Sequence, residues 1–101
     1  MIHVIADIRV APGRRDEFLE EFRRLTPAVH AEQGCLEYGP TLDAATNISV
    51  QRRLDDVVTV VEKWASLAAL EAHLAAPHMN EYRERVKDMV TGVELRILEP
   101  A

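Results

Sequence analysis

The stretch from Val57 to Tyr82, VVTVVEKWASLAALEAHLAAPHMNEY, holds the clearest structural signals of the chain. It opens with a run of β-branched residues, which favours a strand that ends at Trp64. Ser66 is a typical N-cap for a following helix. The buried stripe of that helix is predicted to consist of Leu67, Leu70 and Leu74. Because Pro77 lacks a backbone N–H, we expect the helix to be split there.

Side chains alternate along the predicted strand, so that one face carries Val58, Val60, Glu62 and Trp64. After Pro77 a second helical stripe is formed by Met79, Tyr82, Val86, Met89 and Val90, and we expect it to close at Gly92. A last strand is predicted from Val93 to Leu98.

The N-terminal half repeats this order of elements. Residues 2–10 alternate apolar and polar side chains, which is typical of a strand. A helix is predicted from about residue 13 to about 32, with Gly34 as its left-handed C-cap. A second extended segment begins at Cys35 and is expected to be disturbed by Gly39-Pro40. Residues 43–56 are polar, and we expect an exposed excursion in which Ile48-Ser49-Val50 forms an extra edge strand.

The predicted order is β-α-β-β-α-β over residues 1–101, one α+β domain with a ferredoxin-like split β-α-β antiparallel sheet and helices on one face. The apolar residues on the two faces of the sheet present more surface than two helices on one side can cover. They are Val57 or Val58, Val61, Ile5, and Leu95 or Leu98. We therefore expect a homodimer in which two sheets pack face to face.

Composition narrows the classes of function. A length of 101 residues suits a single domain, and a net charge of −5 offers no basic field for nucleic acid or an anionic membrane surface. Cys35 is the only cysteine, which excludes an intramolecular disulfide and suits a reducing cytoplasm. No signal peptide or membrane span is recognised. We expect a soluble cytoplasmic protein.

Four short motifs occur in a characteristic order: APG at 11–13, EQGCLEYG at 32–39, VVEKW at 60–64 and LEAHLAAPHM at 70–79. Together they resemble the antibiotic biosynthesis monooxygenase family of dimeric α+β barrels, and in particular its quinol monooxygenases. The resemblance covers nearly the whole chain except about residues 43–56. Related members include quinol and anthrone oxygenases without metal or flavin, haem-degrading oxygenases and isomerases of small metabolites.

The resemblance implies a pocket between sheet and helices, with Trp64 at its strand end and His73 and His78 nearby. Tyr38 and Tyr82 are further candidates for its lining. A buried tryptophan is often simply part of the core. The functional alternative is a flat wall on which an aromatic substrate stacks.

Glu62 shares the buried strand face, so its carboxylate needs a partner or a proton. We favour an ion pair with Arg9, Arg96 or Lys63 of a partner chain, and the alternative is that Glu62 orients His73. His73 borders the buried leucine stripe three residues after Leu70 and could act as a general base. His78 could complete this site or cap the following turn.

The spacing of the two histidines does not suit a metal site. His73 and His78 are five residues apart, about 140° around an ideal helix, and Pro77 intervenes. Haem is also not expected, because the segment NEYRERVKDMV, where haem-degrading relatives carry their axial ligand, holds no histidine. We expect no cofactor.

The predicted function is therefore cofactor-independent oxidation of a quinol, naphthol or anthrone by O₂. His73, with or without His78, would be the base, and Trp64, Tyr38, Tyr82 and Glu62 would bind the substrate. Two alternatives stay open: an isomerase that uses the same base, and a dimeric ligand-binding module without chemistry.

Overall fold

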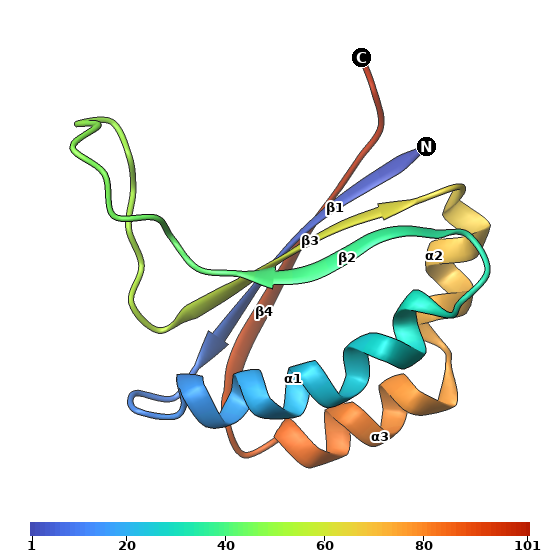
Figure 1. Cartoon of the computed structure of the whole chain (residues 1–101), viewed down its shortest axis with the longest axis horizontal. Helices are drawn as coiled ribbons and strands as arrows, with labels where there is room; N and C mark the ends of the chain where they lie inside the picture. Colours follow the sequence, from blue (N-terminus) through green and yellow to red (C-terminus); the bar gives the residue numbers. More distant parts are fainter.

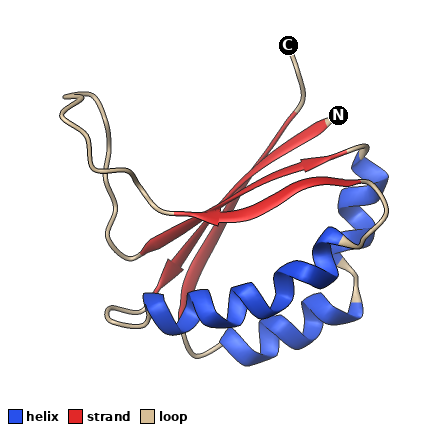
Figure 2. Ribbon diagram, viewed as in Figure 1, coloured by secondary structure: helices blue, strands red, loops and turns tan.

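A computed structural model describes residues 1–101. Four antiparallel strands form one sheet in the order β2-β3-β1-β4, and the helices cover one of its faces (Figures 1 and 2). The elements follow one another as β1 (Ile2–Val10), α1 (Arg15–His30), β2 (Cys35–Thr41), β3 (Val57–Trp64), α2 (Leu67–Leu74), α3 (Pro77–Val86) and β4 (Val90–Leu98). The predicted ferredoxin-like α+β architecture is confirmed.

Strand β3 behaves as its sequence indicates. Val58, Val60, Glu62 and Trp64 are buried on the helix side, and the residues between them are only partly buried. β3 is an inner strand that pairs with β2 on one side and with β1 on the other, where Glu62 lies opposite Val4. The side chains of β3 that face the helices therefore stand near the middle of the core.

The break at Pro77 is also confirmed. The Ser66 hydroxyl oxygen accepts a hydrogen bond from the Ala69 backbone N–H at 3.1 Å and caps α2. Pro77 occupies the first turn of α3, where its missing N–H is not needed. The change of direction between α2 and α3 places His73 at the end of one helix and His78 at the start of the next.

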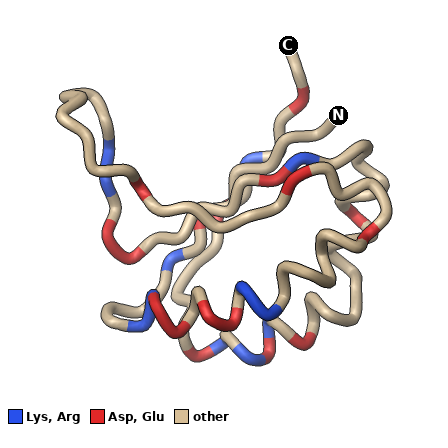
Figure 3. The backbone as a smooth tube through the Cα atoms, in the orientation of Figure 1, with Lys and Arg blue, Asp and Glu red and all other residues tan.

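Apolar side chains of α1 fill the space between the helices and the sheet. Phe18 and Phe22 are fully buried, and Tyr82 of α3 meets both rings edge-on at centroid distances of 6.2 and 5.9 Å. On the outer surface of the helices acidic and basic residues are interleaved, as Figure 3 shows along α1 and α3. No helix is both long and apolar enough to cross a membrane.

Several predicted boundaries were wrong. The first helix covers 15–30, within two residues of the predicted bounds at each end, but the second helical region ends at Val86 rather than Gly92, and the last strand begins at Val90 rather than Val93. β2 continues through Gly39-Pro40 to Thr41. Pro40 is tolerated because β2 is an edge strand, where one missing N–H need not interrupt a ladder.

The extra edge strand at Ile48-Ser49-Val50 was likewise wrong. Residues 42–56 form an exposed arm that extends away from the sheet (Figure 1). Local bonds shape the arm: the Asp43 carboxylate accepts from the Leu54 N–H at 2.7 Å, and Gln51 Nε2 donates to the Ala44 carbonyl at 2.7 Å. A strand could not form because the arm has no neighbouring strand with which to pair.

Gly34 was predicted to be the helix C-cap, but the cap is Ala31, in a right-handed conformation. Gly34 lies three residues later, in the turn into β2, with a φ of +83°. Its carbonyl accepts from the Ala65 N–H at 2.8 Å. A Cβ at this position would lie 2.7 Å from the Ala69 Cβ. Glycine is needed here both for its backbone angle and for the close approach of α2.

Replacing Gly34 by Ala is therefore expected to destabilise the fold more than replacing Gly13, the matched control. Gly13 has a similar φ of +82°, but no atom would lie within 4 Å of an added Cβ. Both changes should lower the free energy of unfolding by about 1–2 kcal/mol, because alanine disfavours a left-handed backbone. Gly34→Ala should lower it by a further ~1–3 kcal/mol, because the added Cβ overpacks the contact with α2. Urea unfolding of the two variants measures the difference, and equal losses would contradict the proposed clash.

Candidate functional site

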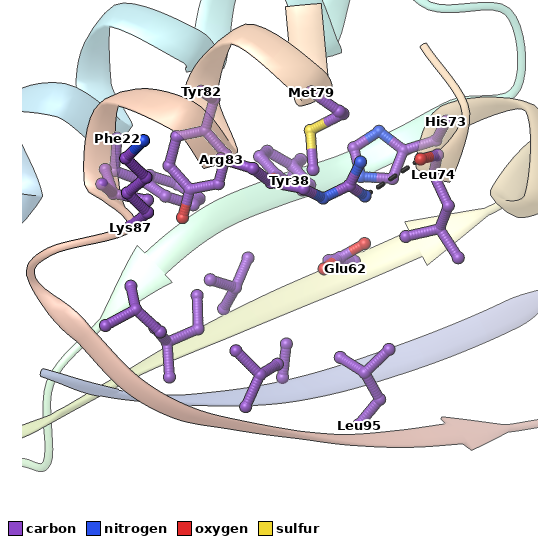
Figure 4. A pocket seen from close by; sticks show the side chains of 16 residues that line it. Phe22, Tyr38, Glu62, His73, Leu74, Met79, Tyr82, Arg83, Lys87 and Leu95 are labelled. Carbon is purple, nitrogen blue, oxygen red and sulfur yellow. Dashed lines mark hydrogen bonds between the residues drawn. The ribbon is translucent and has the colours of Figure 1, made fainter.

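A cavity of about 370 Å³ lies between the sheet and α3 (Figure 4). Twelve of its sixteen lining residues are hydrophobic, and β1, β3, β4 and α3 all contribute to its walls. The other four are Glu62, His73, Arg83 and Lys87, and two of the hydrophobic twelve, Tyr38 and Tyr82, carry hydroxyl groups. Four of the six predicted site residues, namely Tyr38, Glu62, His73 and Tyr82, therefore meet at one cavity. Trp64 and His78 do not line it.

Trp64 lies behind the cavity wall and is fully buried. Its ring packs on His73 at a centroid distance of 4.6 Å and meets Tyr38 edge-on at 6.4 Å. The indole Nε1 donates a hydrogen bond to Glu62 Oε1 at 2.9 Å. Trp64 thus supports three lining residues, and the face predicted for a stacked substrate is occupied by His73.

Glu62 has no cationic partner within its own chain. Arg9 pairs with Glu94 at 2.9 Å and Lys63 pairs with Glu37 at 3.2 Å. Arg9, Lys63 and Arg96 all alternate away from the cavity side of the sheet. An intrachain ion pair is thus absent because these side chains point to the opposite face. Burial raises the pKa of Glu62 to about 7, although the Trp64 N–H opposes the shift.

This pKa predicts a pH-dependent stability that should vanish in Glu62→Gln. Between the ordinary value of 4.5 and about 7, the folded state holds the Glu62 proton and the unfolded state does not. The free energy of unfolding therefore falls as pH rises through that window. At pH 8 the Gln variant, whose amide oxygen can still accept from Trp64, should be more stable than the parent by about 3 kcal/mol.

Urea unfolding at pH 4, 6 and 8 measures the difference between Glu62→Gln and its parent. The expected difference is close to zero at pH 4 and largest at pH 8. A difference that stays constant over this range would contradict the raised pKa of Glu62.

His73 is held by a residue that the sequence did not single out. Its Nδ1 lies 2.9 Å from Oε2 of Glu32, and Nε2 of His78 lies 2.8 Å from the same oxygen. A carboxylate only accepts hydrogen bonds, so both ring nitrogens donate. His73 therefore carries its proton on Nδ1 when neutral, and its unprotonated Nε2 remains available as a base. The predicted orienting role of Glu62 is performed by Glu32.

The environment of His73 opposes charge. Burial lowers its pKa, while the hydrogen bond and negative charge of Glu32 act in the opposite direction. His78 is more exposed: 30% of its side chain is accessible, compared with 2% for His73. The predicted pair is thus brought together through Glu32, but only His73 reaches the cavity. No group of three or more histidine, cysteine or acidic side chains is arranged to hold a metal ion.

Tyr38 and Tyr82 flank the cavity as buried phenols. The Tyr38 ring stacks on Phe22 at 5.4 Å, with 13° between the planes. The Tyr82 hydroxyl points into the cavity (Figure 4). Burial raises the pKa of both hydroxyls, so they stay protonated at neutral pH and can donate hydrogen bonds to a bound ligand.

Two cations were missed by the sequence analysis. Arg83 and Lys87 of α3 and the turn after it border the cavity. Arg83 Nη2 donates to the Leu74 carbonyl at 2.9 Å, which fixes its guanidinium near the end of α2. In the sequence both residues look like part of the charged outer helix face. Only their spacing of four residues indicates that they share one side of a helix.

The site thus combines an imidazole, a protonatable carboxyl, two phenol donors and two cations around an apolar space. Such a cavity can enclose a flat aromatic ring, accept a proton from its hydroxyl at His73, and hold its oxygen atoms by hydrogen bonds from the tyrosines. The cations at the rim favour an anion over a neutral molecule.

Comparisons with known proteins agree with this fold and show the family. The family model described as "Antibiotic biosynthesis monooxygenase" matches residues 1–85. The chain is 43% identical over 102 residues to "Probable quinol monooxygenase YgiN" of Escherichia coli K12, covering 99% of this chain and 98% of the relative. The solved structure of PA3566 from Pseudomonas aeruginosa superposes with a TM-score of 0.80 at 26% identity, over 99% of this chain and 93% of that one. The structure of Rv0793 from Mycobacterium tuberculosis superposes with a TM-score of 0.80 at 25% identity, over 99% of this chain and 94% of that one.

Proposed function

Because the chain belongs to the antibiotic biosynthesis monooxygenase family, we propose that it oxidises a quinol-type aromatic with O₂ and without a metal or flavin. The relative that shares 43% identity is named as a probable quinol monooxygenase, which makes a hydroquinone the first substrate class to consider. The observation that carries the proposal is His73, a base oriented by Glu32 at the wall of an apolar cavity.

The cavity suits such a ring in size and polarity. Its volume of about 370 Å³ falls within the range of about 300–1,000 Å³ typical of small-molecule pockets. Apolar walls exclude water from the ring, and the hydroxyls of Tyr38 and Tyr82 can hold its two oxygen atoms. Arg83 and Lys87 stabilise the negative charge that forms when the substrate loses a proton.

The reaction balances without an external reductant. Nε2 of His73 takes a hydroxyl proton, and the resulting anion gives one electron to O₂. The two radicals join as a new carbon–oxygen bond forms on the ring. Loss of water from the hydroperoxide then leaves a hydroxyquinone, so that one oxygen atom enters the product and the other leaves as water. All four electrons come from the substrate.

An oxygen electrode tests this proposal with a panel of chemically reduced benzoquinones and naphthoquinones. We expect enzyme-dependent oxygen uptake that saturates with at least one reduced quinone, after subtraction of autoxidation and in the presence of a metal chelator. Uptake no faster than autoxidation across the panel would count against an oxygenase of this type.

A second candidate, an isomerase of a small keto compound, is favoured by the position of Glu62. His73 and Glu62 both line the cavity, so that one of them can remove a proton from one carbon while the other returns a proton to a second carbon. Turnover of such a substrate under strictly anaerobic conditions would favour this function. Binding of quinols and keto acids without turnover would instead favour a ligand-binding module.

We further propose that the functional unit is a homodimer. By register with β1, Val93, Leu95 and Ile97 lie on the helix side of β4, yet they are 57%, 45% and 48% exposed, because no helix covers this edge. Leu98 lies on the opposite face. A second copy would remove this apolar surface from water. Light scattering at micromolar concentration should give about twice the monomer mass, and monomer alone would contradict the proposal.

A further inference from the structure

One oxygen atom of Glu32 joins a buried histidine to a solvent-accessible one. Glu32 follows α1, and its Oε2 lies 2.9 Å from Nδ1 of His73 and 2.8 Å from Nε2 of His78. The accessible fractions of the three side chains are 2% for His73, 14% for Glu32 and 30% for His78. The three residues therefore form a continuous path from the cavity wall to the outer surface of the helices.

We propose that Glu32 is the positioning residue for His73, and that His78 regulates how strongly Glu32 supports a proton on His73. The inference rests on the proposed function, in which His73 is the base. It assigns no contact with substrate to Glu32 or His78, since neither lines the cavity.

Glu32 acts on His73 in two ways. Its carboxylate fixes the Nδ1–H tautomer and leaves Nε2 as the proton acceptor. When Nε2 takes a proton, the ring becomes a cation in a site where only 2% of the side chain is accessible. A carboxylate 2.9 Å away then supplies the counter-charge that solvent cannot. Loss of the negative charge should thus weaken the base without changing the shape of the cavity.

His78 acts on the same carboxylate from the other side. When His78 carries a proton, it shares the charge of Glu32 and adds a positive charge near His73. A protonated His78 therefore makes His73 a weaker base, and a neutral His78 makes it a stronger one. Removing the charge of Glu32 and removing the charge of His78 should consequently move the pKa of His73 in opposite directions.

The other charged and titratable groups near the rings of His73 and His78 stay the same when Glu32 or His78 is replaced. Those near His73 are Tyr38 from β2, Glu62 from β3 and Arg83 from α3, and Cys35 of β2 lies near Glu32. The groups that share the surface hollow beside His78 are Arg24, Glu81 and Arg85. Arg85 is already paired with Glu21 at 2.8 Å, as is Arg24 at 3.4 Å. Glu32 alone bonds to both histidines.

The experiment compares Glu32→Gln, His78→Gln and the matched control Glu20→Gln. Glu20 is an exposed residue of α1 and bonds to neither histidine, so its replacement removes one negative charge without touching the pair. Nitrogen-15 spectra of the histidine rings give the tautomer and the pKa of His73 in the ligand-free protein. They also report whether each variant is folded. Oxygen uptake with the best reduced quinone of the panel gives kcat and KM.

In the parent we expect His73 to carry its proton on Nδ1. Glu32→Gln should lower the pKa of His73 by about one unit or more, and lower kcat up to about tenfold with little change in KM. His78→Gln keeps a donor for Glu32 and should shift the pKa of His73 upward by a smaller amount. Glu20→Gln should change neither quantity.

An unchanged pKa of His73 in folded Glu32→Gln would overturn the inference, whatever the activity. A shift in the same direction for both variants, or none for His78→Gln, would overturn the part played by His78. If the pKa values move as expected but oxygen uptake does not depend on His73, the coupling stands and the proposed base is wrong. The two failures are thereby distinguished.

Discussion

Replacing His73 by Ala is expected to lower turnover of a reduced quinone by about 10²–10⁴-fold, the usual contribution of a positioned general base. The substrate hydroxyl loses the acceptor that Glu32 orients. Glu62 also lines the cavity, but its pKa of about 7 keeps a large share of it protonated at neutral pH, so it replaces His73 only in part. Initial rates of oxygen uptake, corrected for autoxidation, measure this effect.

The stability of the variant must be controlled, because His73 is buried and packs on Trp64. His73→Gln keeps most of the volume and serves as a second variant. His3→Ala is the matched histidine control, since His3 alternates to the sheet face that points away from the cavity. Circular dichroism establishes that each variant is folded. Oxygen uptake by folded His73→Ala equal to that of His3→Ala would remove His73 from the role of base.

Replacing Trp64 by Ala is expected to destabilise the fold by about 3–5 kcal/mol, as is typical of large-to-small changes in a core. Trp64 is fully buried, and its loss leaves a void behind His73 and Tyr38. It also removes the N–H that Glu62 accepts at 2.9 Å. Two effects therefore add: lost packing, and a buried carboxyl without its donor.

Trp64→Phe separates these effects, because phenylalanine retains a ring but has no N–H to donate. We expect Trp64→Phe to cost less than the alanine variant and to raise the pKa of Glu62 further. Leu67→Ala is the control. Leu67 was wrongly predicted to belong to the buried stripe of α2: it is 50% exposed, and the buried residues of α2 are Leu70 and His73, so its loss should cost about 1 kcal/mol or less. Urea unfolding measures all three, and a loss for Trp64→Ala no larger than for Leu67→Ala would contradict the supporting role of Trp64.

Local signals explain why much of the fold could be predicted from the sequence. The alternation from Val58 to Trp64, the cap at Ser66 and the break at Pro77 each depend on residues adjacent in the chain. These signals fix the order of elements and the side of β3 that faces the helices. Tyr38, Glu62, His73 and Tyr82 converge because their elements cover the same cavity.

The remaining features depend on contacts that no local pattern reveals. Glu32 lies 41 residues from His73 and 46 from His78, and the turn that presents it has no periodicity. The only sequence signal for Glu32 is its place in the motif EQGCLEYG, and that motif indicates the family and the fold rather than a role for Glu32. Arg83 and Lys87 have the composition of a solvated face and border the cavity only because of how α3 packs. The arm at 42–56 lacks a strand because it lacks a neighbour.

The two proposed reactions offer a role for the buried carboxyl of Glu62. Glu62 is 6% exposed and its only hydrogen-bond donor from a side chain is Trp64. Its raised pKa makes the folded state less stable above neutral pH, so packing alone does not account for it. A carboxyl that can hold or release a proton beside His73 is useful to either of the two proposed reactions.

Mass spectrometry of the product formed under ¹⁸O₂ tests the central claim most directly. The parent protein, a reduced naphthoquinone and labelled oxygen should yield a hydroxyquinone that contains one ¹⁸O atom, formed much more slowly by His73→Ala. The same product in ordinary O₂ and labelled water should carry no label at the new hydroxyl when analysed before exchange. Unlabelled quinone with no added oxygen atom, or a product formed equally well without O₂, would contradict monooxygenation.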